Sequence, residues 1–168
     1  MTDIKATIIN RDINPYHSLL SSFLAGLAEL GLVNQGSMNI VSKRAADYLY
    51  EYLDANEILP DMKAVPGDTV TEVVKNLMLY INNIISLMGE FDLQEVDGDR
   101  AVLLIAEDKC RICPKSVGSA EVKGTLCPIP SFLDGLVNNI AGEELITLVK
   151  TGIEKEDTTC KVIYQLKS

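Results

Sequence analysis

The sequence predicts an α+β fold, in which a twisted antiparallel sheet of about four strands, built from two hairpins, packs against helices on one face. Three observations predict it. Apolar residues recur at helical spacing up to about residue 89, and they alternate at strand spacing from about residue 90 onward. No repeat, low-complexity tract or long linker interrupts the 168 residues. We therefore expect one domain over residues 1–168, with a helical half and a sheet half.

Two helices are expected early in the chain. The Asn14-Pro15 pair is a typical helix start, because Asn caps the first turn and Pro fits its first position. An apolar stripe follows this pair and ends at Gly31. A second stripe predicts a helix over about residues 38–55, and the proline-containing segment after it predicts a loop.

The clearest helical signal begins at Thr69. Thr69 and Glu72 match a capping box, in which each side chain accepts a hydrogen bond from the backbone N–H of the other residue. Apolar residues then follow at helical spacing for about five turns, as far as Met88. The stripe is wide, so we expect this helix to be buried on more than one side.

The second half predicts two hairpins with a short helix between them. The Asp97-Gly98 pair is a typical hairpin turn, and Gly142 is a typical helix stop. The expected strands are residues 91–96, 100–107, about 144–153 and about 159–166, and the charged segment 154–157 is the expected turn between the last two.

The charge balance excludes several classes of partner. The chain has 24 acidic and 15 basic residues, for a net charge of −9. Such a field repels phosphate backbones and anionic bilayers, so neither nucleic acid nor a membrane is an expected partner. The N-terminal residues carry charges where a signal peptide needs an apolar core, so we expect a cytoplasmic protein, whose thiols stay mostly reduced.

The cysteines form the one pattern that suggests chemistry, with the spacing C-x2-C-x13-C-x32-C. A Cys-x-x-Cys pair lets two thiolates from one turn reach one metal. In a sheet of two hairpins, the start of the last strand can approach the loop that leaves the second strand. We therefore expect Cys110, Cys113, Cys127 and Cys160 to bind one metal ion, zinc first and iron second.

A closed shell of four cysteines indicates a structural metal, because catalytic zinc keeps an open position. Cys127 lies just before the expected short helix, whose N-terminal dipole favours a lowered pKa of its thiol. Cations near the thiols would offset the charge of a four-thiolate centre. Those close in sequence are Lys109, Arg111, Lys115, Lys123 and Lys161.

Two other interpretations of the cysteines stay open. Cys110 and Cys113 match a redox dithiol, although that motif normally opens a helix, and Pro114 and Gly118 favour a loop here. The thiols are alternatively ordinary buried side chains with no shared role.

No catalytic residue is assigned. The single histidine, His17, has no nucleophile motif beside it, and we expect it to be a partly exposed polar residue of the first helix rather than a ligand. No phosphate-binding glycine loop follows a strand.

The C-terminal part resembles a known family. The segments GTLCPIPSFLDGLVNNIAG and TTCKVIYQL, at residues 124–142 and 158–166, resemble the C-terminal half of 4-vinyl reductase-like domains. This resemblance implies an α+β fold related to a subunit of the Golgi transport-particle tethering complex and to the ligand-binding fold of nitric-oxide signalling. It also implies a small apolar ligand held between helices and sheet, near a zinc site made largely of cysteines. In that comparison Cys127 and Cys160 match family cysteines, whereas Gly152 stands where sensor-type members have another cysteine.

Function is therefore expected to be ligand binding or sensing by a module with a structural zinc site. A reductase or thiol-redox enzyme and a scaffold subunit are the alternatives, and a homodimer is the expected assembly. The expected lining of the ligand pocket combines the 69–88 helix with the short helix near the C-terminus. It comprises Leu77, Met78, Ile81, Ile84, Ile85, Phe132 and Leu136.

Overall fold

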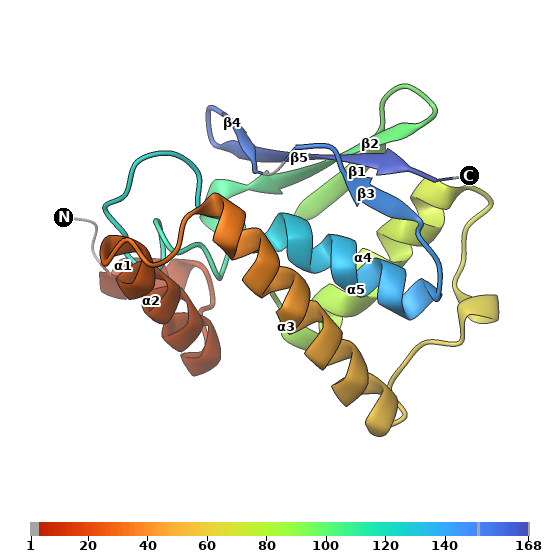
Figure 1. Ribbon diagram of the computed structural model, residues 1–168, viewed down its shortest axis with the longest axis horizontal. Coiled ribbons are helices and arrows are strands. Elements are labelled where there is room, and N and C mark those ends of the chain that lie inside the picture. Colours follow the sequence, from red (N-terminus) through yellow and green to blue (C-terminus); the bar gives the residue numbers. More distant parts are fainter. Residues whose placement is uncertain (1–3, 151, 168) are drawn as a thin grey trace.

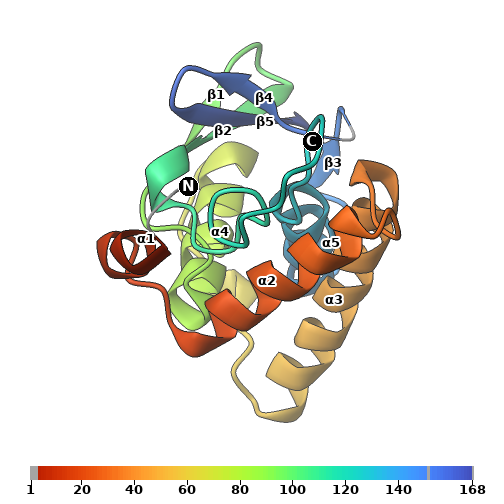
Figure 2. The same ribbon diagram turned by 90° about the vertical axis from the view of Figure 1, so that its left-hand side faces the viewer.

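The computed structural model describes residues 4–150 and 152–167, so the outer ends of the expected domain and position 151 of the expected third strand lie outside the described residues. The fold is α+β, with one antiparallel sheet lying along one side of the helices (Figure 1). Figure 1 shows the first two helices at the end of the molecule opposite the turn at residues 96–99, and Figure 2, which faces that end, shows them on the outside. Among the described residues, no helix is long and apolar enough to cross a bilayer.

The N-terminal part contains α1 (Ile4–Asn10), α2 (Pro15–Glu29) and α3 (Gln35–Ala55). The expected start of α2 is confirmed, since the Asn14 side chain caps the first turn. Helix α1 was not predicted, and α3 begins a few residues earlier than expected because Asn34 forms a second cap. These caps satisfy backbone N–H groups that a helix leaves unpaired at its start.

Helix α4 spans Val70–Ile85 and begins with the expected capping box of Thr69 and Glu72. It ends earlier than Met88, because Ser86 adopts the left-handed conformation with φ 51°. Met88 then forms an isolated antiparallel bridge with Cys110. The chain after α4 is thereby joined to the segment that carries the first cysteines.

The sheet has five strands in the described residues rather than the expected four. The strand order is β1-β2-β5-β3, and β4 also pairs with β5, so β5 pairs with three others. Buried residues alternate along β2 and β5, and this places Leu103 and Val162 on the face that the helices cover. The strands are β1 (Phe91–Glu95), β2 (Arg100–Ala106), β3 (Ile146–Leu148), β4 (Glu154–Glu156) and β5 (Thr159–Leu166).

The third expected strand and the turn after it were wrong in detail. The chain forms β3 over only three residues, and the charged segment expected as a turn contains β4. Beside the break, Gly152 packs so closely on Thr125 that a Cβ would lie 2.9 Å from its hydroxyl oxygen. A continuous strand is replaced here by a contact with the loop around residue 125.

Helix α5 (Ile129–Ala141) is buried between α3 and the sheet. Gly135 allows a close approach to α3, since a Cβ there would lie 3.0 Å from that of Ala46. The Tyr164 hydroxyl of β5 donates to the Pro130 carbonyl oxygen at 2.9 Å inside the core. The first contact packs α5 against α3, and the second holds the first turn of α5 against β5.

Candidate metal centre

All four cysteines line one cavity of about 240 Å³ between the sheet and the loop that joins β2 to α5. Cys110 and Cys113 belong to the loop after β2, Cys127 precedes α5, and Cys160 lies on β5. Three chain segments thus bring the four thiols to one cavity. The walls between them are mostly apolar, with Ile105, Leu126, Ile129 and Ile153.

The loop that carries Cys110 and Cys113 is closed by its own backbone. The Cys113 carbonyl accepts hydrogen bonds from the N–H groups of Val117 (2.9 Å) and Gly118 (3.1 Å). The Ser116 N–H donates to the Cys113 sulfur at 3.5 Å. This local turn aims the Cys113 thiol into the cavity without help from a helix.

Cys127 is held by a side chain of α3. The Cys127 N–H donates to the Gln35 Oε1 atom at 2.8 Å, and the Gln35 Nε2 atom donates to the Cys127 carbonyl at 3.0 Å. The Gln35 amide therefore pairs with both polar groups of one backbone residue. Cys160 is positioned differently, by strand pairing opposite Ile105 on β2 and Lys155 on β4.

The thiols influence one another's ionisation. A hydrogen bond from the Cys110 thiol lowers the pKa of Cys113, and the same bond, together with burial, raises the pKa of Cys110 well above its ordinary value. Burial also raises the pKa of Cys160. Cys113 is therefore the first of the four thiols to lose its proton as pH rises.

The expected lowering of the pKa of Cys127 was wrong. Its side chain is fully buried, and this burial raises the pKa of the thiol, an effect that the Ile129 N–H at the start of α5 offsets only in part. The free energy needed to remove a thiolate from water exceeds the stabilisation that the first turn of a helix gives to that charge.

Cations lie at the cavity, although only one of the five expected lysines and arginines lines it. Lys115 lines the cavity and donates to the Gly124 carbonyl at 3.0 Å, and Lys155 forms an ion pair of 2.8 Å with Glu107. Lys161 instead pairs with Glu156, outside the cavity lining. Lys155 and Glu107 were not singled out from the sequence.

Arg11 also was not predicted to be near the cysteines. Its Nη1 atom donates to the carbonyls of Glu107 (2.7 Å) and Cys110 (2.9 Å) and lies 3.1 Å from the Ser116 hydroxyl oxygen. Arg111 returns the contact, because its Nε atom donates to the Arg11 carbonyl at 2.9 Å. No local pattern relates residues so far apart in the sequence.

The sulfurs surround a common space but are not arranged as a ready coordination shell. Within residues 4–150 and 152–167, no group of three or more His, Cys, Asp or Glu side chains is placed to hold a metal ion. All four cysteines are free thiols. Ligation by all four would therefore need their side chains to turn toward one centre.

The residues expected to line an apolar ligand pocket separate into two groups. Leu77, Met78, Ile81 and Leu136 are fully buried. The others contribute to a second cavity, of about 360 Å³, beneath the start of α2. Its apolar lining includes Ile84, Ile85 and Phe132 together with Tyr16, Leu20, Leu49, Leu87 and Ile112.

His17 also borders this second cavity, but it is buried rather than partly exposed as expected. Its Nδ1 atom accepts from the Asn14 N–H at 3.3 Å, and its Nε2 atom lies 3.2 Å from the Ile85 carbonyl oxygen. Both ring nitrogens are therefore engaged in joining α2 to α4.

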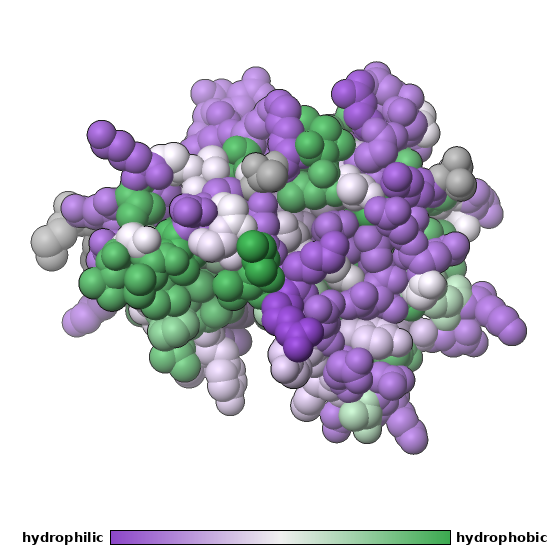
Figure 3. Space-filling model, viewed as in Figure 1, coloured by the Kyte–Doolittle hydropathy of each residue, from purple (hydrophilic) through white to green (hydrophobic). Residues whose placement is uncertain are grey.

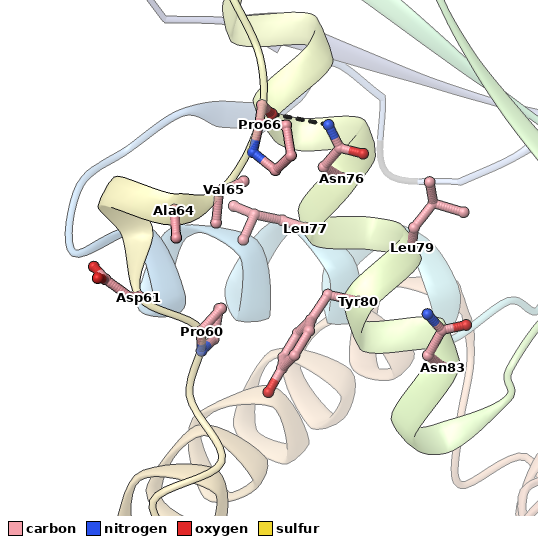
Figure 4. Close-up of a pocket in the computed structure, with 10 residues that line it drawn as sticks. All are labelled: Pro60, Asp61, Ala64, Val65, Pro66, Asn76, Leu77, Leu79, Tyr80 and Asn83. Carbon is pink, nitrogen blue, oxygen red and sulfur yellow. Dashed lines mark hydrogen bonds between the residues drawn. The ribbon is translucent and has the colours of Figure 1, made fainter.

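A third cavity, of about 370 Å³, lies between α4 and the loop that precedes it (Figure 4). The Asn76 side chain crosses toward this loop and donates to the Pro66 carbonyl at 2.8 Å. Among its lining residues only Asp61 and Tyr80 ionise, and Leu77 is its one member of the expected ligand pocket. It has no thiol, so we place the candidate site at the cysteines.

Comparison with known proteins gives a family for most of the chain. The uncharacterized protein MJ1342 of Methanocaldococcus jannaschii is 31% identical over 70 residues, which is 42% of this chain and 57% of that protein. The chain thus aligns with just over half the length of that relative. No solved structure matches this chain. Residues 31–166, which include α3 to β5 and all four cysteines, match the MJ0207 family, and the chain belongs to this family.

Proposed function

We propose that this protein is a small-ligand-binding module in which Cys110, Cys113, Cys127 and Cys160 hold one structural zinc ion. A single observation carries this proposal, which is that all four cysteines line one cavity although they come from three separate segments. Four cysteines that were buried independently of one another would not be expected to line the same cavity. Zinc is the first choice because four thiolates suit it in number and in softness.

The residues present fit such an ion in donor type and in surroundings. Four thiolates would leave a zinc centre with a net negative charge, and Lys115 and Lys155 border the same cavity. The apolar side chains between the sulfurs exclude water, which favours metal–thiolate bonds. The metal would supply cross-linking, since four thiolates leave zinc no vacant position for a substrate.

A bound zinc ion would join three parts of the fold. It would tie the loop after β2 to the start of β5 and to the residue before α5. Because an unfolded chain binds zinc much less well, the free energy of metal binding would add to the free energy of unfolding. The proposed role of the metal is thus stability and not catalysis.

The ligand-binding part of the proposal rests on the second cavity. Its volume of about 360 Å³ falls within the usual range for small-molecule sites, and its lining is mostly apolar. The proposed ligand is a small apolar molecule that enters between α2 and α4, beside Ile84 and Phe132. This places it among helices rather than between helices and sheet.

Two observations support a relationship to 4-vinyl reductase-like domains and, through them, to the Golgi transport-particle subunit fold. The chain has the α+β architecture that the resemblance implies. Gly152, where sensor-type members have a cysteine, lies against Thr125, which lines the cysteine cavity. A cysteine at that position would therefore be near the other thiols.

Native mass spectrometry of protein purified under reducing, chelator-free conditions tests both parts together. We expect one zinc per chain and a copurified small molecule. Each Cys→Ser variant should lose the zinc, whereas Ala120→Ser, a buried position in the same loop but outside the proposed ligand set, should keep it. Absence of metal from the parent protein would refute the zinc site, and absence of a copurified apolar molecule would count against the ligand.

A thiol-redox function is the second candidate. The hydrogen bond between Cys110 and Cys113, with a lowered pKa at Cys113, is the arrangement of a reactive Cys-x-x-Cys pair. If this function holds, metal-free protein should form a Cys110–Cys113 disulfide with glutathione disulfide, which is reduced to two glutathione thiols, and excess reduced glutathione should reverse the step. Metal bound by both sulfurs would protect them from alkylation, so alkylation with and without chelator distinguishes the two functions.

A further inference from the structure

Helix α2 is apolar on both of its faces. One face packs inward, where Leu24 and Ala28 join Met38 and Leu126 in a small core under the cysteine loop. The opposite face carries large apolar side chains that are mainly exposed, and we name these residues the α2 stripe. They are Tyr16, Leu19, Leu20, Phe23 and Leu30.

The α2 stripe is conspicuous on the molecular surface. Figure 3 shows a broad apolar area over the end of the molecule where α2 lies. Tyr16 is 80% exposed, Phe23 62% and Leu30 75%. Residues 15–28 contain no Asp, Glu, Lys or Arg that would solvate the helix. A surface helix normally presents polar or charged side chains to water, so this apolar face lacks its partner in the isolated chain.

We infer that the α2 stripe is a homodimer interface, in which α2 packs antiparallel against α2 of a second copy. Tyr16, Leu19, Phe23 and Leu30, with Gly26 between the last two, follow the alternating three- and four-residue spacing of a helix-pair seam. Such a seam matches helix-to-helix packing and not a flat surface.

The stripe is self-complementary about Phe23. In a two-fold antiparallel pair, Phe23 meets its own copy on the axis, and Tyr16 and Leu30, which lie equally far before and after it, face each other. Leu20 then faces Gly26. A Cβ at Gly26 would meet nothing within 4 Å in the single chain, so the space over this glycine is open to receive a leucine.

The exposed area suffices for a stable pair. At roughly 150–200 Å² for each fully exposed large side chain, the stripe offers about 500–650 Å² on one copy and about 1,000–1,300 Å² in a pair. Specific interfaces bury at least about 1,000 Å². The flanking Leu32, Ile40 and Val41 are also exposed and close in sequence to the end of the stripe.

A second copy fits this face better than a lipid surface does. The net charge of −9 opposes an anionic bilayer. The nearby Arg11 guanidinium is occupied by backbone carbonyls of the cysteine loop and is not available for lipid headgroups. A closed two-fold pair covers the stripe completely without any further partner.

Sedimentation velocity of the full chain, from about 1 to 100 µM, tests the inference. The parent should sediment as a dimer across most of this range. Phe23→Glu places two carboxylates together on the axis, and Gly26→Leu fills the space that receives Leu20, so each should weaken dimerisation at least tenfold. Val96→Glu, at an exposed apolar position in the β1–β2 turn, is the matched control and should leave the dimer unchanged.

Gly26→Leu also separates lost dimerisation from lost folding. Leucine favours a helix more than glycine does, and a Cβ at this position has no neighbour within 4 Å in the single chain, so this variant should be no less folded by circular dichroism. Zinc content is measured in parallel and should not change. A parent that is monomeric at 100 µM, or variants that dimerise like the parent, would overturn the inference. Binding of a monomeric parent to neutral phosphatidylcholine vesicles would assign the stripe to lipid instead.

Discussion

The Arg11 guanidinium donates a hydrogen bond of 2.9 Å to the backbone carbonyl of Cys110, although 99 positions separate the two residues. The same nitrogen also donates to the Glu107 carbonyl. One side chain from the N-terminal part thus fixes the backbone of the loop that carries the first two cysteines. The proposed metal centre therefore depends on a residue that contributes no ligand to it.

Arg11→Ala should lower the free energy of unfolding by about 2–3 kcal/mol, because partly buried carbonyls lose a charged donor. Arg11→Lys should recover only part of this, since one ammonium group does not reproduce the planar fork. Urea unfolding checks both. Arg44→Ala, at an exposed arginine of α3, is the control and should cost less than about 0.5 kcal/mol. An Arg11→Ala variant as stable as this control would contradict the anchoring role.

Gln35→Ala should lower the free energy of unfolding by about 1–3 kcal/mol, because both polar backbone groups of Cys127 lose their partner. Metal affinity should fall as well, since Cys127 is no longer held in place. Chemical denaturation and zinc titration with a competing chelator measure the two effects. The matched substitution Gln94→Ala, at an exposed glutamine of β1, is expected to change neither quantity.

Cys127→Ser and Cys160→Ser should each reduce zinc content and the melting temperature together. A fall of about 5–10 °C is expected for a loss of a few kcal/mol in a chain of this size. In chelator, the parent and Cys160→Ser should melt within about 2 °C of each other, because the metal is then absent from both. Variants that lose zinc but melt like the parent would show that the site is not structural.

Asp134 should make stability depend on pH. Burial raises the pKa of its carboxyl group above the ordinary value, and Lys43, at 3.7 Å, offsets this in part. The folded state therefore holds the proton more tightly, and the stabilisation present below the unfolded pKa is lost as pH rises through the folded pKa. The melting temperature of Asp134→Asn, relative to that of the parent, should therefore rise as pH increases from about 4 to about 7.

Asp92 provides a control of opposite sign for the same measurement. Its hydrogen bond with Lys75, at 2.6 Å, lowers the pKa of the carboxyl group. The contribution of Asp92 to stability is present above the unfolded pKa and is lost as pH falls. The melting temperature of Asp92→Asn relative to the parent should therefore fall as pH rises from about 2 to about 4, and should change little between about pH 5 and pH 7. Parallel pH profiles for the two variants would contradict both assignments.

The parts of the fold that the sequence predicted are those governed by neighbouring residues. The capping box of Thr69 and Glu72 and the helix start at Asn14 depend on a few consecutive positions, and both are confirmed. The β1–β2 hairpin likewise follows from alternation on either side of Asp97-Gly98. The four cysteines were expected to bind one metal ion; they line one cavity, but among the described residues their side chains do not form a ready coordination shell.

The parts that were missed depend on residues far apart. The Arg11 contact, the Gln35 amide pair and the break between β3 and β4 arise from loops meeting in three dimensions. The pKa of Cys127 was misjudged for a related reason, because burial is set by the whole fold whereas a helix start is visible locally. Long-range packing therefore determined most of the differences.

Strand β5 is the last strand along the chain but lies inside the sheet, between β2 and β3, and β4 also pairs with it. During synthesis, β3 and β4 consequently have no partner until residues 159–166 have emerged. Until then the β1–β2 hairpin presents an unpaired edge at β2, which is a template for association with other chains. A nascent chain that stalls before Thr159 should therefore be much more prone to aggregate than one that stalls after Leu166.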